Sequence, residues 1–262
     1  MNVKIGMGQI LVEGGKVREN LKRAVEMIEK AAVEECDIIV LPECLDVGWT
    51  YPETSRLAEP IPGPHSDLFC RIAREQNINI VLGLSEVVPG LSKNEDGKIY
   101  NTALFISKEG EILLKHRKIN ILDIALDIYT VGDRLGVVDT EFGRIGINIC
   151  ADNFPGNLSL GRSLGEMGAK LLLSPSAWAV KPDHDNIREP YGDLWLGSYQ
   201  TLSREYNMTV VGVSNVGDVT GGPWDGYKCI GCSLAVGPGG KVLGKSPYGK
   251  DKVDLKIISL TI

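Results

Sequence analysis

The chain has 262 residues, 43% of them hydrophobic and 24% charged, which is typical of a folded protein with one large domain or two small ones. Its net charge of -6 and scattered basic residues argue against a nucleic-acid partner, because polyanion binding needs clustered Lys and Arg. No apolar run is long enough to span a bilayer, and no secretory signal is visible. We therefore expect a cytoplasmic protein without membrane association, whose six cysteines are reduced thiols rather than a disulfide scaffold.

The first part of the chain alternates between strands and helices. Alternating apolar residues predict a strand over 3–7, and apolar residues at helical spacing predict an amphipathic helix over 17–32. The apolar run 37–41 is typical of a strand buried on both faces. A second helix is expected over 66–76 and a strand over 78–84.

The rest of the chain adds hairpins to this alternation. The expected elements are a surface loop over 90–97, a hairpin of strands 102–106 and 111–114, a strand over 143–150, a helix over 156–167, a strand over 170–173, a helix over 190–206, strands over 208–214, 232–236 and 241–244, and an edge or partner-facing strand over 255–262. Such mixing favours a layered α/β sandwich over an all-parallel sheet. Since we find neither a repeat nor a linker, a single domain over 1–262 is the simplest interpretation.

Polar residues follow three of the predicted strands, at positions where α/β folds build their sites. They are Glu43 after 37–41, the basic cluster 116–118, and Cys150 at the end of 143–150. Each has an ordinary explanation, as a capping carboxylate, a solvated cluster and a small buried thiol. No single one of the three decides the function.

Together these segments resemble the nitrilase superfamily of carbon–nitrogen hydrolases over essentially the whole chain. Residues 41–43 match its glutamate motif, 116–118 its lysine motif and 148–152 its cysteine motif. Flanking segments that also match are 5–9, 20–21, 172–178, 214–217, 231–233 and 237–240. The resemblance implies a four-layer αββα sandwich of the nitrilase type.

The same resemblance implies the roles of three catalytic residues. Cys150 would attack a carbonyl or nitrile carbon and form a covalent thioester or thioimidate. Glu43 would take the thiol proton, pass it to the departing amine and then activate water. Lys118, with the backbone N–H of Ala151, would hold the tetrahedral oxyanion. This chemistry needs neither a metal nor an organic cofactor.

The sequence departs from the family pattern at two positions. Family members commonly carry a second glutamate between the lysine and the cysteine, and Asp127 lies nearest to its expected place. We therefore expect Asp127 to be an auxiliary carboxylate. Ala151 stands where the family usually has an aromatic residue, which favours a small amide or N-carbamoyl substrate over a nitrile.

Four residues near the motifs are candidates for the substrate pocket. Ala151, Asn153 and Phe154 follow the nucleophile, and Trp178 follows the next predicted strand. The aromatic residues among them have an ordinary alternative as core residues, because aromatic side chains bury readily. The resemblance also implies a homodimer or a higher homo-oligomer.

Other functions remain open alternatives. Cys229 and Cys232 have the spacing of a zinc or redox motif, but the three histidines have no paired spacing, so no metal site is expected. Nitrile hydrolysis by the same three residues is an alternative, as is a binding protein of the same fold with impaired catalysis. Acyl transfer to an amine or lipid is disfavoured because the chain lacks membrane segments.

Overall fold

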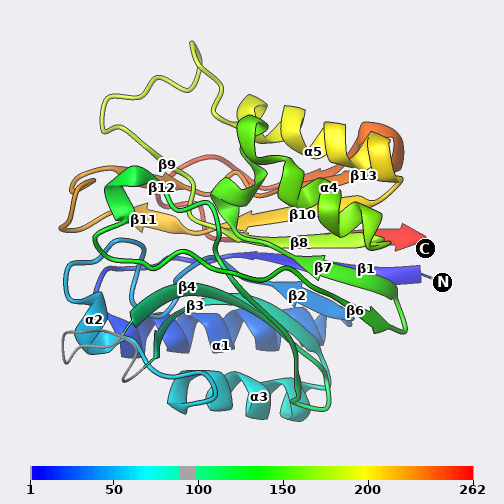
Figure 1. Cartoon of the computed structure of the whole chain (residues 1–262), viewed down its shortest axis with the longest axis horizontal. Helices are drawn as coiled ribbons and strands as arrows, with labels where there is room; N and C mark the ends of the chain where they lie inside the picture. The colour runs from blue at the N-terminus through cyan, green and yellow to red at the C-terminus, as the bar shows by residue number, and fades with distance from the viewer. Residues whose placement is uncertain (1, 89–97, 262) are drawn as a thin grey trace.

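Two stacked sheets form the centre of the molecule. A computed structural model describes residues 2–88 and 98–261, so the loop expected over 90–97 lies outside the described residues. Helices α1 and α3 cover the outer side of one sheet, and α4 and α5 cover the outer side of the other (Figure 1). This arrangement confirms the four-layer αββα sandwich that the resemblance implied.

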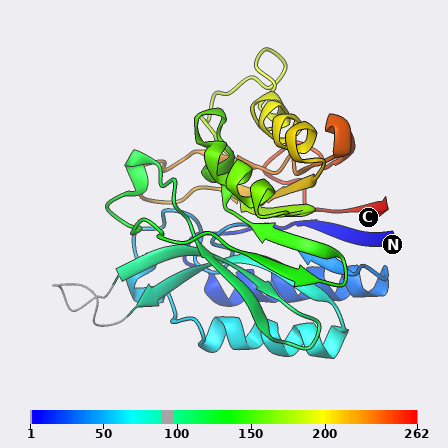
Figure 2. The ribbon, with the colours of Figure 1, turned by 45° about the vertical axis from the view of Figure 1, so that its right-hand side comes forward.

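The first sheet has six strands in the order β15-β1-β2-β3-β4-β5. Its strands are β1 (Asn2–Gln9), β2 (Ile38–Val40), β3 (Asn79–Val88), β4 (Lys98–Ile106), β5 (Ile112–Arg117) and β15 (Asp254–Thr261). Strands β1, β2 and β3 are parallel to one another, whereas β4, β5 and β15 pair antiparallel with their neighbours. The C-terminal strand therefore lies at a sheet edge as expected, and it brings the two termini side by side (Figure 2).

The second sheet also has six strands, in the order β14-β13-β10-β8-β7-β6. Its strands are β6 (Val137–Thr140), β7 (Gly143–Ile147), β8 (Leu171–Ser176), β10 (Thr209–Ser214), β13 (Leu234–Gly237) and β14 (Lys241–Lys245). A small third sheet, in the order β11-β12-β9, was not predicted; its strands are β9 (Ala179–Val180), β11 (Val216–Asp218) and β12 (Lys228–Ile230). The helices are α1 (Val17–Val33), α2 (Thr54–Leu57), α3 (Pro64–Gln76), α4 (Ser159–Glu166) and α5 (Gly192–Tyr206).

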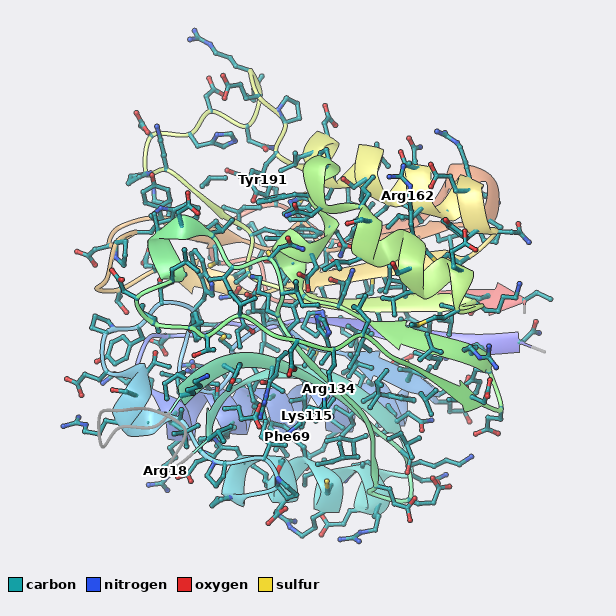
Figure 3. All side chains as sticks on the ribbon, viewed as in Figure 1. Arg18, Phe69, Lys115, Arg134, Arg162 and Tyr191 are labelled. Atoms are coloured by element: carbon teal, nitrogen blue, oxygen red, sulfur yellow. The ribbon has the colours of Figure 1, made fainter. Side chains whose placement is uncertain are left out.

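The alternation of side chains along each strand fills two separate cores. Val40 and Phe105 of the first sheet point inward and pack in the cluster that contains Ile147 of the second sheet. Ile39 points the other way, toward the layer of α1 and α3, in which Phe69 of α3 is completely buried (Figure 3). Since successive strand residues point to opposite faces, a shift of one residue would exchange the two cores.

Among the predicted strand ends that were wrong, two concern the motifs. The strand expected to end at residue 114 continues as β5 to Arg117, because β4 extends the pairing and places Thr102 opposite Arg117. The strand expected to end at Cys150 stops at Ile147, and Cys150 begins a 3-10 turn, Cys150–Asn153. The basic cluster thus lies largely within a strand, and the cysteine lies outside one.

Candidate active site

The ends of β4 and β5 direct their alternate side chains between the two sheets. His116 pairs with Ala103, whose side chain belongs to the inter-sheet core. Two residues farther along the strand direction, the N–H of Lys118 donates to the carbonyl of Asn101 at 2.8 Å. Asn101 and Lys118 therefore share the inward face with Ala103 and His116, because side-chain direction repeats every second residue. All four of these side chains are buried.

Glu43 meets Lys118 in this interior. The Nζ of Lys118 lies 2.6 Å from Oε1 of Glu43, and Nδ2 of Asn101 donates to the same oxygen at 2.5 Å. The exposed fractions of Glu43, Lys118 and Asn101 are 1%, 2% and 0%. A glycine on β3 makes this approach feasible, since a Cβ on Gly83 would lie 2.7 Å from the Cα of Glu43. The result is a desolvated ion pair with an added amide donor.

Cys150 sits on a strained turn against the second sheet. Its φ of 44° lies in the left-handed region, which costs a non-glycine residue free energy and is typical of functional sites. The N–H of Cys150 donates to Oγ of Ser174 at 3.2 Å, and the N–H of Asp152 donates to the carbonyl of Ile149 at 2.9 Å. Between these two engaged donors lies the N–H of Ala151, in the first turn of a 3-10 helix, where backbone donors lack intrahelical acceptors.

The ion pair acts directly on the thiol of Cys150. Burial raises the pKa of this thiol well above its ordinary value, the Glu43 carboxylate raises it further, and the Lys118 ammonium opposes both. Burial by itself would lower the pKa of Lys118, but the Glu43 carboxylate opposes burial through its charge and its hydrogen bond, and the pKa of Lys118 is raised. The resting site therefore holds a charged lysine and a protonated thiol, with a carboxylate beside them to receive the thiol proton.

A buried carboxylate connects the segment that carries Lys118 to the turn that carries Cys150. Asp152 accepts from the N–H of Ile149 at 3.0 Å and from the N–H of Asn120 at 2.8 Å, and it lies 2.9 Å from Nε2 of His116. Nδ1 of His116 lies 3.2 Å from the carbonyl of Arg134, a residue labelled in Figure 3. Burial would raise the pKa of Asp152, but hydrogen bonding and the charge of His116 outweigh it, so the pKa falls. Asp152 is therefore a charged anchor for both motifs.

A stack of aromatic side chains lies beside the turn Cys150–Asn153. Trp178 and Trp195 stack with ring centroids 4.8 Å apart, and Trp195 stacks on Phe154 at 5.2 Å. Trp178 and Trp195 are buried, whereas Phe154 and Tyr191 are only partly buried against the same cluster as Cys150. Tyr191 lies at the start of α5, where the exposed loop of residues 181–190 ends (Figure 3). Phe154 and Tyr191 are therefore the more accessible members of this aromatic group.

The other pocket candidates have different surroundings. Ala151 is completely buried, and its carbonyl accepts from Nδ2 of Asn157 at 2.8 Å. The carboxamide of Asn153 exchanges hydrogen bonds with that of Asn148 at 2.6 and 2.9 Å and donates to Ser174 at 2.9 Å. Asn153 therefore braces the turn that carries Cys150.

The structure does not bring Asp127 to the ion pair. Its side chain is exposed, just past the 3-10 turn Asp123–Ala125. Tyr129 is the buried residue of this segment; its Oη accepts from the N–H of Thr50 at 3.2 Å and lies 3.6 Å from Sγ of Cys44. The expectation for Asp127 relied on its distance along the chain, which does not reveal that the loop turns this side chain outward.

Sequence reasoning missed Asn101, Trp195 and Tyr129 as neighbours of the site. A signal existed for Asn101, since continuing the strand pairing four residue pairs beyond Phe105–Leu114 places it opposite Lys118. No comparable signal existed for Trp195, because its helical spacing is that of any core residue of α5.

No alternative site emerges from the part of the chain that the structure describes. Residues 2–88 and 98–261 contain no group of three or more His, Cys, Asp or Glu side chains that could hold a metal ion. Cys229 and Cys232 flank Gly231, whose missing side chain gives room to Gln9, because a Cβ there would lie 2.1 Å from Nε2 of Gln9. None of the described helices has the length and apolar character to cross a membrane.

Comparison with known proteins places the chain in a family. The sequence profile of the carbon-nitrogen hydrolase family matches residues 5–260. The chain belongs to this family. The carbon–nitrogen hydrolase fold is also seen in a mutant amidase from Nesterenkonia sp. AN1, which has a TM-score of 0.79 at 19% identity and covers 98% of this chain and 90% of its own. In that mutant, the acetamide moiety of fluoroacetamide is added covalently at the active-site cysteine.

Curated relatives include named amidases. Omega-amidase NIT2-A of Xenopus laevis is 33% identical over 67% of this chain. The matched part spans 63% of the length of that omega-amidase. An (R)-stereoselective amidase from Pseudomonas sp. is 28% identical over 96% of this chain and 82% of its own length. This chain is thus similar to enzymes that are named for amide hydrolysis.

Proposed function

We propose that the protein hydrolyses the C–N bond of a small amide, with Cys150 as nucleophile, Glu43 as general base and Lys118 as the cation that stabilises the oxyanion. The observation that carries this proposal is the buried Glu43–Lys118 pair at 2.6 Å, whose two charges both act on the Cys150 thiol. An ion pair that only stabilised the fold would not need to act on a cysteine with a left-handed φ. Relatives named as amidases support the same reaction class.

In the acylation step, Glu43 takes the thiol proton as Sγ of Cys150 attacks the amide carbon. The carbonyl oxygen becomes an oxyanion, for which the Lys118 ammonium and the Ala151 N–H are the donors. The C–N bond breaks, its electron pair goes to nitrogen, and Glu43 gives the proton to the departing amine. A thioester on Cys150 remains.

Water then completes the cycle. Glu43 accepts a proton from water, the resulting nucleophile attacks the thioester carbon, and the C–S bond breaks. The acid leaves, and the thiol recovers its proton from Glu43. Because the resting thiol is protonated, turnover depends on the carboxylate in both half-reactions.

The test is a substrate panel of small amides, N-carbamoyl amines and nitriles, with ammonia detection. Wild-type protein should release ammonia from amides, and Cys150→Ala should fold normally but show no turnover, because a methyl group cannot form the thioester. Cys70→Ala, at a partly buried thiol on α3, is the matched control and should keep wild-type rates. Amide turnover that survives in Cys150→Ala contradicts the proposal.

We further propose a single catalytic domain over 1–262 that works in the cytoplasm as a homo-oligomer. The resemblance to the family supports assembly, and Met167 and Leu194 on the α4–α5 layer, 42% and 40% exposed, are candidates for the interface. Sedimentation at several protein concentrations tests this, and a monomer at all of them contradicts it.

A further inference from the structure

Two buried acceptor oxygens beside the ion pair have no N–H or O–H donor. Lys118 and Asn101 both donate to Oε1 of Glu43, at 2.6 and 2.5 Å. Among residues 2–88 and 98–261, no N–H or O–H group donates to Oε2 of Glu43 or to Oδ1 of Asn101, and the further donor beside the carboxylate is the weak S–H of Cys150. Since Glu43 is 1% exposed and Asn101 is 0% exposed, both oxygens are desolvated. Buried acceptors without donors are costly, so they point to a ligand that brings N–H or O–H groups.

The orientation of the Asn101 carboxamide is fixed by its neighbour. Its Nδ2 contacts a carboxylate oxygen, and the reverse orientation would set two acceptor oxygens against each other. Oδ1 of Asn101 is therefore the free atom. The carboxamide and the carboxylate are in direct contact, so their unpartnered oxygens belong to one polar patch next to Cys150.

This patch matches the leaving nitrogen of a particular substrate class. We propose that Asn101 is a specificity-determining residue, whose Oδ1 accepts a hydrogen bond from one N–H of the departing nitrogen while Oε2 of Glu43 accepts a hydrogen bond from the other N–H. These two acceptors restrict substrates to an unsubstituted –CONH2 group. This assignment rests on the proposed function. An unsubstituted carboxamide has two N–H donors for two acceptors, whereas an N-alkyl amide has one and leaves an acceptor unpaired.

During acylation, the role of Asn101 is to position the leaving nitrogen. Cys150–SH and R–CONH2 give Cys150–S–CO–R and NH3; the S–C bond forms, the C–N bond breaks, and the thiol proton travels through Glu43 to nitrogen. Asn101 gains and loses no proton. It holds the nitrogen so that one lone pair can face the Glu43 proton as the C–N bond lengthens.

Burial adds a steric reason for the same selectivity. Glu43, Lys118, Asn101 and Cys150 are at most 8% exposed, so an N-alkyl group would have to fit among closely packed side chains. Variation on the acyl side of the substrate would meet the partly buried Phe154 instead.

The first experiment uses the wild-type protein and three substrates with one acyl group: the primary amide, the N-methyl amide and the methyl ester. We expect kcat/KM for the primary amide to exceed that for the N-methyl amide by roughly a hundredfold or more. Equal rates for the two amides overturn the role of Asn101 but leave the proposed function intact. No hydrolysis of any amide by the wild type overturns the proposed function, and the inference with it.

The second experiment separates leaving-group binding from support of Glu43. Asn101→Ala should lower kcat/KM for the primary amide by roughly tenfold more than for the ester, because both reactions lose the Asn101 donor to Glu43 but an alkoxide leaving group has no N–H to bind. A merely structural role would impair Glu43 and lower both rates equally, which overturns the proposal. The amide-to-ester ratio is measured within each variant, so a partly unfolded fraction cancels.

Asn79→Ala is the matched control for this experiment. Asn79 lies on β3 of the same sheet, is 6% exposed, and bonds to the carbonyl of Asp37 and the N–H of Lys108, away from the triad. Its amide-to-ester ratio should equal that of the wild type. A ratio that falls as far in Asn79→Ala as in Asn101→Ala assigns the effect to the sheet and overturns the role of Asn101.

Discussion

The Glu43–Lys118 pair allows a quantitative test of how the site is held together. Both side chains are at most 2% exposed, and their charged atoms are 2.6 Å apart. Removing one charge leaves the other buried without a counter-ion, which costs about 3–5 kcal/mol of unfolding free energy. Glu43→Gln keeps the shape and an acceptor oxygen for Asn101 and Lys118, so we expect about 3 kcal/mol, whereas Lys118→Met should cost toward 5 kcal/mol.

The double variant tests whether Glu43→Gln and Lys118→Met lose unfolding free energy for the same reason. Glu43→Gln with Lys118→Met removes both charges together, so its cost should be less than the sum of the single costs by about 2 kcal/mol. The assay is urea unfolding at pH 7, with unchanged m-values as the condition for comparing midpoints.

Lys115→Met is the matched control for the charge pair. Lys115 also contacts a buried carboxylate, Glu86, at 2.9 Å, but Lys115 is 35% exposed and Arg117 still binds Glu86 in its absence. A partly exposed pair of this kind should contribute about 0–1 kcal/mol. Strictly additive single costs, or a Glu43→Gln cost as small as that of Lys115→Met, would refute the buried pair as the organising contact.

Three further predictions concern residues around the site. Asp127→Asn should leave kcat/KM almost unchanged, because the side chain is exposed; a tenfold loss would return Asp127 to the site. Asp152→Asn should destabilise the protein at pH 7. The urea midpoints of this variant and of the wild type should converge as pH falls below about 3.9, because Asp152 has a lowered pKa in the folded state and its contribution to the unfolding free energy is lost on protonation. A pH-independent difference would contradict this. Gly231→Ala should cost about 2 kcal/mol or more, because φ is 62° and a Cβ would clash with Gln9, whereas Gly156→Ala, with open space, should cost little; equal melting temperatures would contradict it.

Individual helices and strands could be predicted because they depend on local patterns, whereas the four layers were implied by the resemblance to the family. Helix α1 was expected over 17–32 and spans Val17–Val33, since its apolar positions recur at helical spacing. The third sheet could not be predicted, because β9 has two residues and β11 and β12 have three each, too few for any periodicity. Such strands exist through pairing with segments that are distant in the chain.

The site was predictable in part for a similar reason. Motif matches made Glu43, Lys118 and Cys150 the candidate residues, and in the structure the charges of Glu43 and Lys118 both act on the pKa of the Cys150 thiol. Asn101 was missed because the end of β4 depends on its pairing with β5 beyond the predicted hairpin. Asp127 was misplaced because side-chain direction in a loop follows from tertiary contacts, here those of Tyr129, and not from spacing.

The central claim is that Cys150 carries the acyl group during turnover. Intact-protein mass spectrometry during hydrolysis of a slow amide, followed by peptide mapping, tests this most directly. The account predicts one acyl adduct per chain, on Cys150, which builds up and decays with turnover and is missing in Glu43→Gln. An adduct on Cys229 or Cys232, or turnover without any adduct on Cys150 under conditions where deacylation is slow, would contradict it.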